Sequence, residues 1–186
     1  MSTLEVNTIT PQSGTTITIG GSGDTVTLGS GATQSGFGGV MTPSFHAYRS
    51  SDQSISEETD TKIQFDTEQF DTDGCYDNST NYRFTPTTAG KYFIYGAIYW
   101  VQGSTTNLKN TGLKIYKNGS NHRRVFTLFT GSYVQYHAQQ IGSIVEFNGT
   151  TDYVELYGVY DTQNNGGCSA YGGADVTYFG GYRIIE

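Results

Sequence analysis

The chain has 186 residues and a formal net charge of −7, with 10 Lys and Arg against 17 Asp and Glu. Such an acidic chain is repelled by phosphate backbones, which argues against nucleic-acid binding. No apolar run is long enough to span a bilayer, and the first residues lack the pattern of a secretory signal. We therefore expect synthesis in a cytoplasm and no membrane insertion. Hydrophobic residues make up only 35%, but 15 Tyr and 10 Phe supply large side chains for a core.

Residues 1–36 differ from the rest, because Thr, Ser and Gly dominate and no aromatic residue precedes Phe37. The pattern Thr-Ile-Thr-Ile-Gly at 16–20 returns at 25–29 as Thr-Val-Thr-Leu-Gly, and such alternation predicts short β-strands. One copy has too few apolar residues to offset its ordering entropy, so we expect an extended β-type arm or short shaft that orders against identical strands or another protein. A flexible linker is the alternative. The candidate contact residues of the arm are Leu4, Val6, Ile9, Ile17, Ile19, Val26 and Leu28.

A Gly-rich hinge is expected over residues 37–43, followed by a body over 44–186. Strand patterns occur in the body at 44–49, 62–66, 91–100, 113–117, 124–129, 133–146, 153–160 and 174–185. Asn118-Gly119 predicts a tight hairpin between two of them, whereas 50–61 and 70–82 are predicted to be a loop and turns. No segment shows a helical period with start and stop signals. The predicted fold class is all-β, a sandwich or a barrel.

Short motifs in the body follow one another in a recognisable order. They include Tyr-Asp at 76–77, Tyr-Arg-Phe-Thr-Pro at 82–86 and Ala-Gly-Lys-Tyr-Phe at 89–93. Around one turn this order resembles the signature of the globular head of complement C1q. Further matches follow in the same order, at Leu113–Gly119, Asp152–Leu156 and Phe179–Ile185. The resemblance covers residues 44–186.

The resemblance implies a TNF/C1q-like jelly roll of about ten strands that assembles as a homotrimer. Aromatic residues expected in the core or the trimer interface are Tyr92, Phe93, Tyr95, Phe179 and Tyr182. The family's animal members carry a secretion signal and collagen repeats, and neither pattern occurs in residues 1–43. The opening Leu-Glu-Val-Asn-Thr-Ile at 4–9 is instead similar to the openings of many tailed-phage structural proteins. A trimeric virion protein is therefore expected.

Two groups of residues are candidates for binding. Lys114, Lys117, Arg123 and Arg124 flank the predicted hairpin and could meet an anionic glycan or a carboxylate-bearing neighbour. The alternative is a charged hairpin that keeps an edge strand soluble. Tyr133 and Tyr136 could stack on sugar rings, and packing in the core or trimer interface is the alternative.

Residues suited to catalysis or metal binding form no convincing pattern. The three His are far apart, and neither a nucleophile elbow nor a phosphate-binding loop before a helix is present, so we expect no enzyme activity and no cofactor. Asp71, Asp73 and Asp77 are a weak calcium candidate, with turn capping as the alternative. Cys75 and Cys168 are expected to be free thiols, and a disulfide between them is the minority interpretation.

The expected function is that of a non-enzymatic phage structural protein displayed on the virion surface. In one role it is a short tail fibre whose head contacts a host-surface glycan or protein. In the other it is a capsid decoration protein whose arm clamps the shell through contacts with other virion proteins. A glycan-degrading activity would need a carboxylate pair at a cleft, which the sequence does not indicate.

Overall fold

The computed structural model describes residues 8–32, 41–103 and 107–184. The chain forms two compact units, Met1–Gly38 and Gly39–Glu186, whose boundary falls within the range expected for the hinge. Leu4 and Val6 of the predicted arm, and most of the predicted hinge, lie outside the described residues.

The first unit contains no strand over residues 8–32, although the alternating pattern predicts strands there. Its backbone hydrogen bonds include two turns, in which the Asp24 amide donates to the Gly21 carbonyl and the Ala32 amide to Gly29. Ile9, Ile17, Ile19, Val26 and Leu28 are all exposed, at 41–62% of their surface. A strand needs a partner for its backbone groups, and one copy of this segment supplies none.

The second unit is all-β, as predicted. Its strands are β1 (Ser44–Tyr48), β2 (Gln53–Ile55), β3 (Thr61–Lys62), β4 (Thr67–Asp71), β5 (Tyr76–Asp77), β6 (Arg83–Phe84), β7 (Gly90–Gln102), β8 (Leu108–Lys117), β9 (Ser120–Leu128), β10 (Tyr136–Phe147), β11 (Val154–Thr162), β12 (Cys168–Ala170) and β13 (Tyr178–Arg183). Within the described residues, no helix is long and apolar enough to cross a membrane.

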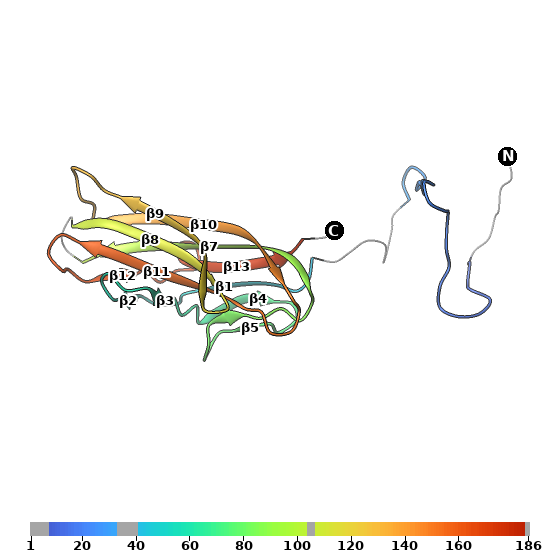
Figure 1. Cartoon of the computed structure of the whole chain (residues 1–186), viewed down its shortest axis with the longest axis horizontal. Coiled ribbons are helices and arrows are strands. Elements are labelled where there is room, and N and C mark those ends of the chain that lie inside the picture. The colour runs from blue at the N-terminus through green and yellow to red at the C-terminus, as the bar shows by residue number, and fades with distance from the viewer. Residues whose placement is uncertain (1–7, 33–40, 104–106, 185–186) are drawn as a thin grey trace. The chain divides into compact units, whose positions relative to one another are not determined.

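The strands form two antiparallel sheets that pack face to face (Figure 1). Sheet A has the order β2-β12-β7-β13-β1-β4, with β10 along the other edge of β7. Sheet B has the order β5-β6-β11-β8-β9, with β3 also on β11. The long strand β7 organises sheet A, because it pairs with β10 along its whole length and with both β13 and β12 on its opposite edge.

The register of the strands defines two ends of this body. At the first end, Ser44 of β1 pairs with Tyr182 of β13, which in turn pairs with Phe93 near the start of β7. The Asn118-Gly119 hairpin lies at this end too, because Lys117 pairs with Val154 at the start of β11. The other end, called the far end below, carries the end of β7, the start of β8 and the loop from β9 to β10 (Figure 1).

The core between the sheets is rich in aromatic residues, as the composition predicts. Phe45 of β1 stacks on Phe84 of β6 with ring centroids 4.3 Å apart and meets Phe179 of β13 edge to face at 5.1 Å. Trp100 of β7 is fully buried and meets the Tyr160 ring at 6.4 Å. Cys75 and Cys168 are both buried free thiols, which confirms the prediction for them.

Several boundaries differ from the sequence prediction. β2 lies inside the predicted loop at 50–61, while β4 and β5 overlap the predicted turns at 70–82. The pattern at 62–66 forms a strand only to Lys62, although Ile63 and Phe65 are still fully buried. Short strands of two or three residues carry too few alternating positions to be recognised. The hairpin is confirmed, because Asn118 and Gly119 both have positive φ, at 51° and 76°.

Candidate functional site

The outer side of sheet A, away from the core, is unusually aromatic. Residues at alternate positions of β7 and β13 point outward there, and Phe93, Tyr95, Tyr99, Tyr178 and Tyr182 remain partly exposed. On β10 the outward positions include Tyr136 and Ile144, which are 51% and 58% exposed. We call this surface of β1, β7, β10 and β13 the aromatic face. A contiguous apolar surface of this kind usually marks an interaction site.

Glycines on neighbouring strands make room for the rings of this face. Tyr95 pairs with Gly142 of β10 on one side and Gly180 of β13 on the other. A Cβ at Gly180 would overlap the Tyr95 ring, and a Cβ at Gly142 would press on the Phe93 ring. The two rings therefore lie flat across the backbone of adjacent strands and do not stand out into solvent.

His46 of β1 joins the aromatic face through Tyr95. Its Nδ1 lies 3.0 Å from the Tyr95 hydroxyl, and its ring contacts those of Phe70 and Tyr178 at 6.1 and 5.4 Å. Burial lowers the pKa of His46 below its ordinary value and raises that of Tyr95. Both groups are thus held in their neutral forms, which suits a surface that packs against another protein.

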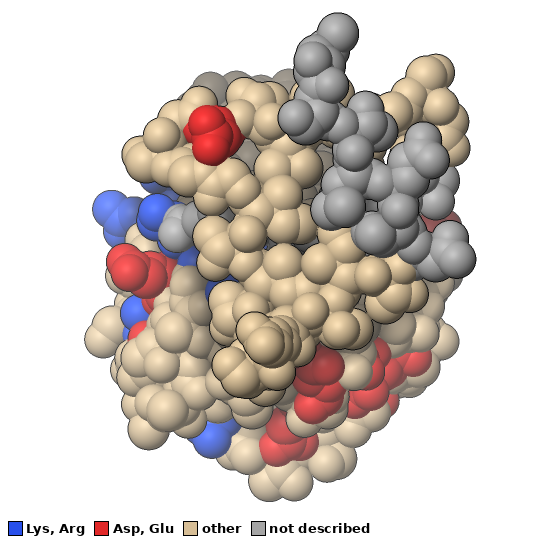
Figure 2. Space-filling view, turned by 90° about the vertical axis from the view of Figure 1, so that its right-hand side faces the viewer, with Lys and Arg blue, Asp and Glu red and all other residues tan. Residues whose placement is uncertain are grey.

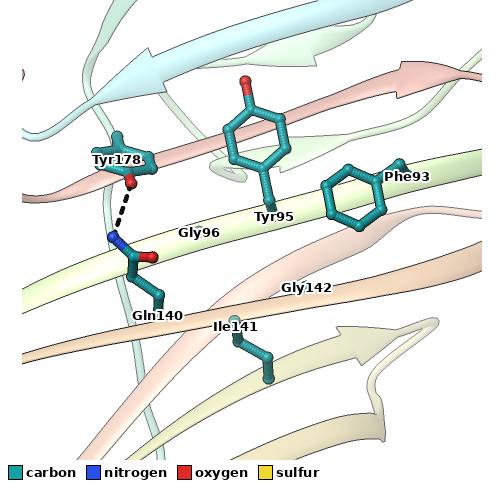
Figure 3. Close-up of a pocket in the computed structure, with 7 residues that line it drawn as sticks. All are labelled: Phe93, Tyr95, Gly96, Gln140, Ile141, Gly142 and Tyr178. Carbon is teal, nitrogen blue, oxygen red and sulfur yellow. Dashed lines mark hydrogen bonds between the residues drawn. The ribbon is translucent and has the colours of Figure 1, made fainter.

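A hollow of about 340 Å³ lies in the aromatic face above Gly96 and Gly142. Tyr178 closes one side, where the Gln140 side chain donates a 3.3 Å hydrogen bond to its hydroxyl across β7 (Figure 3). Phe93 and Tyr95 form the opposite side, while Ile141 of the same lining turns toward the core. Of the residues that the structure describes, no Asp, Glu, Lys, Arg or His lines the hollow.

The outer side of sheet B has a different character, because its lysines are paired with carboxylates within the chain. Lys114 and the Tyr116 hydroxyl both bond to Asp60, and Lys62 lies 2.7 Å from the buried Glu155 carboxylate. The Tyr116 ring packs on Tyr157 with centroids 4.2 Å apart. The hydrogen bond to Asp60 raises the pKa of Tyr116 to about 12.

The six candidate binding residues do not meet at one place. Lys114 is paired with Asp60, and Lys117 is paired with Asp152 near the hairpin at 3.0 Å. Arg123 and Arg124 are exposed on β9, with Arg124 over the Phe126 ring at 5.8 Å. Tyr133 lies in the far-end loop before β10, and Tyr136 stacks on Tyr99 of the aromatic face at 6.2 Å. These residues are neighbours in sequence but are distributed over both ends of the body.

The five residues expected in the core or trimer interface separate into two groups. Tyr92 and Phe179 are fully buried in the core. Phe93, Tyr95 and Tyr182 occupy the intervening positions and point to the aromatic face. Alternation along the strands contains this information. His46, Gln140 and the two glycines were not predicted, because only the pairing of distant strands brings them beside Tyr95 and Tyr178.

The acidic side chains proposed for calcium are engaged with their own backbone. Asp77 accepts hydrogen bonds from the amides of Thr80, Ser79 and Asn81, which lower its pKa strongly. Asp71 accepts one from the Tyr76 amide at 2.7 Å. Figure 2 shows several acidic side chains near one another on the side it presents. Nevertheless, no three His, Cys, Asp or Glu in the described part of the chain are placed to hold a metal ion.

No protein-family model and no curated protein sequence matches the chain. Among solved structures, the globular domain of zebrafish complement 1qA protein is 12% identical, with a TM-score of 0.53, and the match covers 77% of this chain and 98% of that one. Murine APRIL at pH 8.0 is 11% identical, with a TM-score of 0.54 and coverage of 76% and 98%. Eiger TNF from S. frugiperda is 8% identical, with a TM-score of 0.52 and coverage of 76% and 91%. The TNF/C1q-like jelly-roll fold of the body is thereby confirmed.

Proposed function

We propose that the chain is a non-enzymatic structural protein that assembles as a homotrimer and is displayed on a virion surface for host attachment. The aromatic face carries this proposal, because Tyr136, Ile144 and Tyr182 are 51%, 58% and 37% exposed on one surface of sheet A. Aromatic residues are enriched in protein interfaces, and burying them would stabilise an assembly by about 25 cal/mol for each Å² removed from water.

A second copy of this chain is the partner that the face fits. The hollow above Gly142 lies next to the projecting Ile144 of the same strand, so one surface carries both a knob and a hole. Closed rings of identical subunits are built by heterologous contacts, in which one part of a subunit's surface fits a different part of the next subunit. The resemblance of the body to the C1q head, read from the sequence, favours three copies.

The first unit supports attachment to a larger structure. Its five described Ile, Val and Leu side chains are exposed, and residues 8–32 have no core of their own. Ordering this segment would need a second surface that buries those side chains and pairs their backbone. The similarity of residues 4–9 to tailed-phage structural proteins makes other virion proteins the partner that we favour.

A capsid decoration protein is the second candidate, and the length of the arm is compatible with it. About 30 extended residues reach at most about 100 Å, which is enough to lie across neighbouring subunits of a shell. In that role the arm would be the functional part, and the body would be an exposed knob without a host ligand.

The experiment compares the full chain with a variant that begins at Thr42. We expect both to be trimers by light scattering, with a full-chain mass of three times 20.3 kDa, about 61 kDa. Only the full chain should be incorporated into particles. Gold-labelled antibody against the body would then separate the two roles, because label on the tail means a fibre and label over the shell means decoration. A 20.3 kDa species at micromolar concentration, or normal incorporation of the shortened variant, would contradict the proposal.

A further inference from the structure

A second hollow, of about 430 Å³, lies at the far end of the body on the outer side of sheet B. It is separate from the aromatic face, which belongs to the other sheet. Its lining includes Lys109, Asn110, Leu128, Phe129, Tyr133 and Asp161. We call it the far-end hollow.

The register of three strands builds its floor. Asn110 of β8 pairs with Asp161 of β11 on one side and with Leu128 of β9 on the other. Directly paired residues of antiparallel strands point to the same side of a sheet. A carboxylate, an amide and an isobutyl group therefore lie in one row across the end of sheet B.

The polar half of the hollow is balanced in charge. Lys109 Nζ lies 2.6 Å from Asp161 Oδ2, and Asn110 Nδ2 donates to the same oxygen at 3.3 Å. Asp161 Oδ1 and Asn110 Oδ1 have no hydrogen-bond partner among the described residues. The hollow thus presents acceptors, together with the remaining donors of an ammonium group, but almost no net charge.

The apolar half of the hollow consists of side chains from the end of β9 and the loop that follows. Leu128 is 72% exposed, although removing a leucine side chain from water is favourable. Phe129 lines the hollow too, but its ring packs against the core and meets His137 edge to face, and its amide donates a 2.8 Å hydrogen bond to the Lys109 carbonyl, which fixes the chain beside Leu128. Tyr133 adds a ring with a hydroxyl group at its edge.

We propose that the far-end hollow binds a neutral saccharide. A pyranose ring has one apolar C–H surface and a rim of hydroxyl groups, which matches an aromatic and aliphatic wall beside a carboxylate–amide–ammonium row. An anionic sugar fits less well, because the Lys109 charge is already neutralised by Asp161. The inference names the ligand class for host attachment and so rests on the proposed function.

The position of the hollow suits display. It lies on the outer side of sheet B, so assembly through sheet A leaves it open. Three symmetry-related copies would present three such hollows at the same end of the trimer. Weak binding at each hollow then becomes firm attachment to a surface that carries many copies of the saccharide.

The test uses saturation-transfer NMR on the full chain, with methyl glycosides of glucose, galactose, mannose and N-acetylglucosamine as probes. We expect transfer to at least one of them, and at least about tenfold weaker binding by Tyr133→Ala and by Asp161→Asn, since each removes one half of the contact. The methyl glycoside of N-acetylneuraminic acid serves as the anionic comparison and should bind more weakly.

Asp152→Asn is the matched control, because Asp152 is also paired with a lysine of β8, at the opposite end of the sheet. It should leave the transfer unchanged. Absence of transfer to all four neutral probes, equal loss in the control, or preference for the anionic sugar would overturn the inference. Light scattering on the same samples separates the two ideas: a monomer that still binds sugar through Asp161 contradicts the trimer and leaves this site standing.

Discussion

The outer sides of the two sheets accommodate their aromatic and polar side chains in different ways. Each lies outside the core and carries several aromatic rings. On sheet B, tyrosine hydroxyl groups and lysines form hydrogen bonds and ion pairs within the chain. One example is Asp60, which accepts from both the Tyr116 hydroxyl and Lys114. On sheet A the outward positions of β7, β10 and β13 are mostly aromatic, aliphatic, amide or glycine, with Lys91 and Glu146 paired in register at the first end.

This difference gives the two exposed sheet surfaces different energies of contact with water. A surface whose charges are paired with one another is stable in water, and burying it against a partner would gain little free energy. A surface of half-exposed rings with neutral His46 at its margin gains free energy when water is removed. Only the second kind is suited to self-association.

The largest effect is expected from Ile144→Arg. Ile144 is 58% exposed and makes no core contact, so the monomer should fold normally, but a charge there would be buried between copies without a partner. The mass should fall from about 61 kDa to 20.3 kDa by light scattering. Ser120→Arg adds the same charge on the exposed edge strand β9 and should remain trimeric. If Ile144→Arg were still trimeric, sheet A would not be the interface.

A matched pair of glycine substitutions should have a smaller effect and sharpen the comparison. A Cβ at Gly180 overlaps the Tyr95 ring on sheet A, and one at Gly112 overlaps the Phe126 ring on sheet B. Each Gly→Ala change should lower the free energy of unfolding by about 1–3 kcal/mol, because a ring must move. Only Gly180→Ala should also weaken assembly, seen as dissociation at higher protein concentration. Equal weakening by both variants would mean that assembly follows overall stability.

The smallest effect concerns pH. The folded pKa of His46 lies below its ordinary value of 6.5, so the unfolded chain takes up a proton first as the pH falls. Neutral His46 contributes fully to the free energy of unfolding above pH 6.5, and this contribution is lost as the pH falls from 6.5 through the lowered pKa. The contacts of its ring with Phe70, Tyr95 and Tyr178 provide no carboxylate to stabilise the imidazolium.

Melting temperatures at about pH 7 and pH 5 check this expectation. His46→Gln should decrease the loss between the two values. His137 is the comparison. Burial lowers its pKa too, so His137→Gln should also decrease the loss, but its Nε2 contacts Thr127 and is not part of the aromatic face. If His137→Gln removed the pH dependence and His46→Gln did not, the aromatic face would not be the sensor.

Much of the fold could be predicted from the sequence where the strands are long. Alternation along 91–100 contains the separation of the buried Tyr92 from the outward Phe93, although both were expected in one group. The Asn118-Gly119 hairpin follows from two residues that tolerate positive φ. The resemblance to the C1q head provided the architecture before any pairing was known. Short strands such as β2 and β12 were missed, because three residues do not establish a period.

The candidate sites were harder to predict, because they depend on which strands are neighbours. The basic residues around the hairpin look like a cluster in sequence, yet Lys114 and Lys117 are each neutralised by an Asp from a distant segment, Asp60 or Asp152. The far-end hollow combines residues 109–110, 128–133 and 161, and only Tyr133 of these was singled out in advance. Cross-strand register carries that information, and the alternation of residue types does not.

The pairing of β1 with β13 has a consequence for the timing of synthesis. Sheet A cannot be completed until the last strand of the body has left the ribosome, since β13 lies between β1 and β7. Such long-range pairing slows folding, and unpaired strand edges are exposed meanwhile. The Ile- and Val-containing arm is synthesised before any of these strands. On a polysome, many copies of the arm are therefore present next to bodies that are not yet folded. Assembly of this protein is therefore expected to begin only after β13 has emerged from the ribosome, and its yield should depend on the rate at which β13 pairs with β1 and β7.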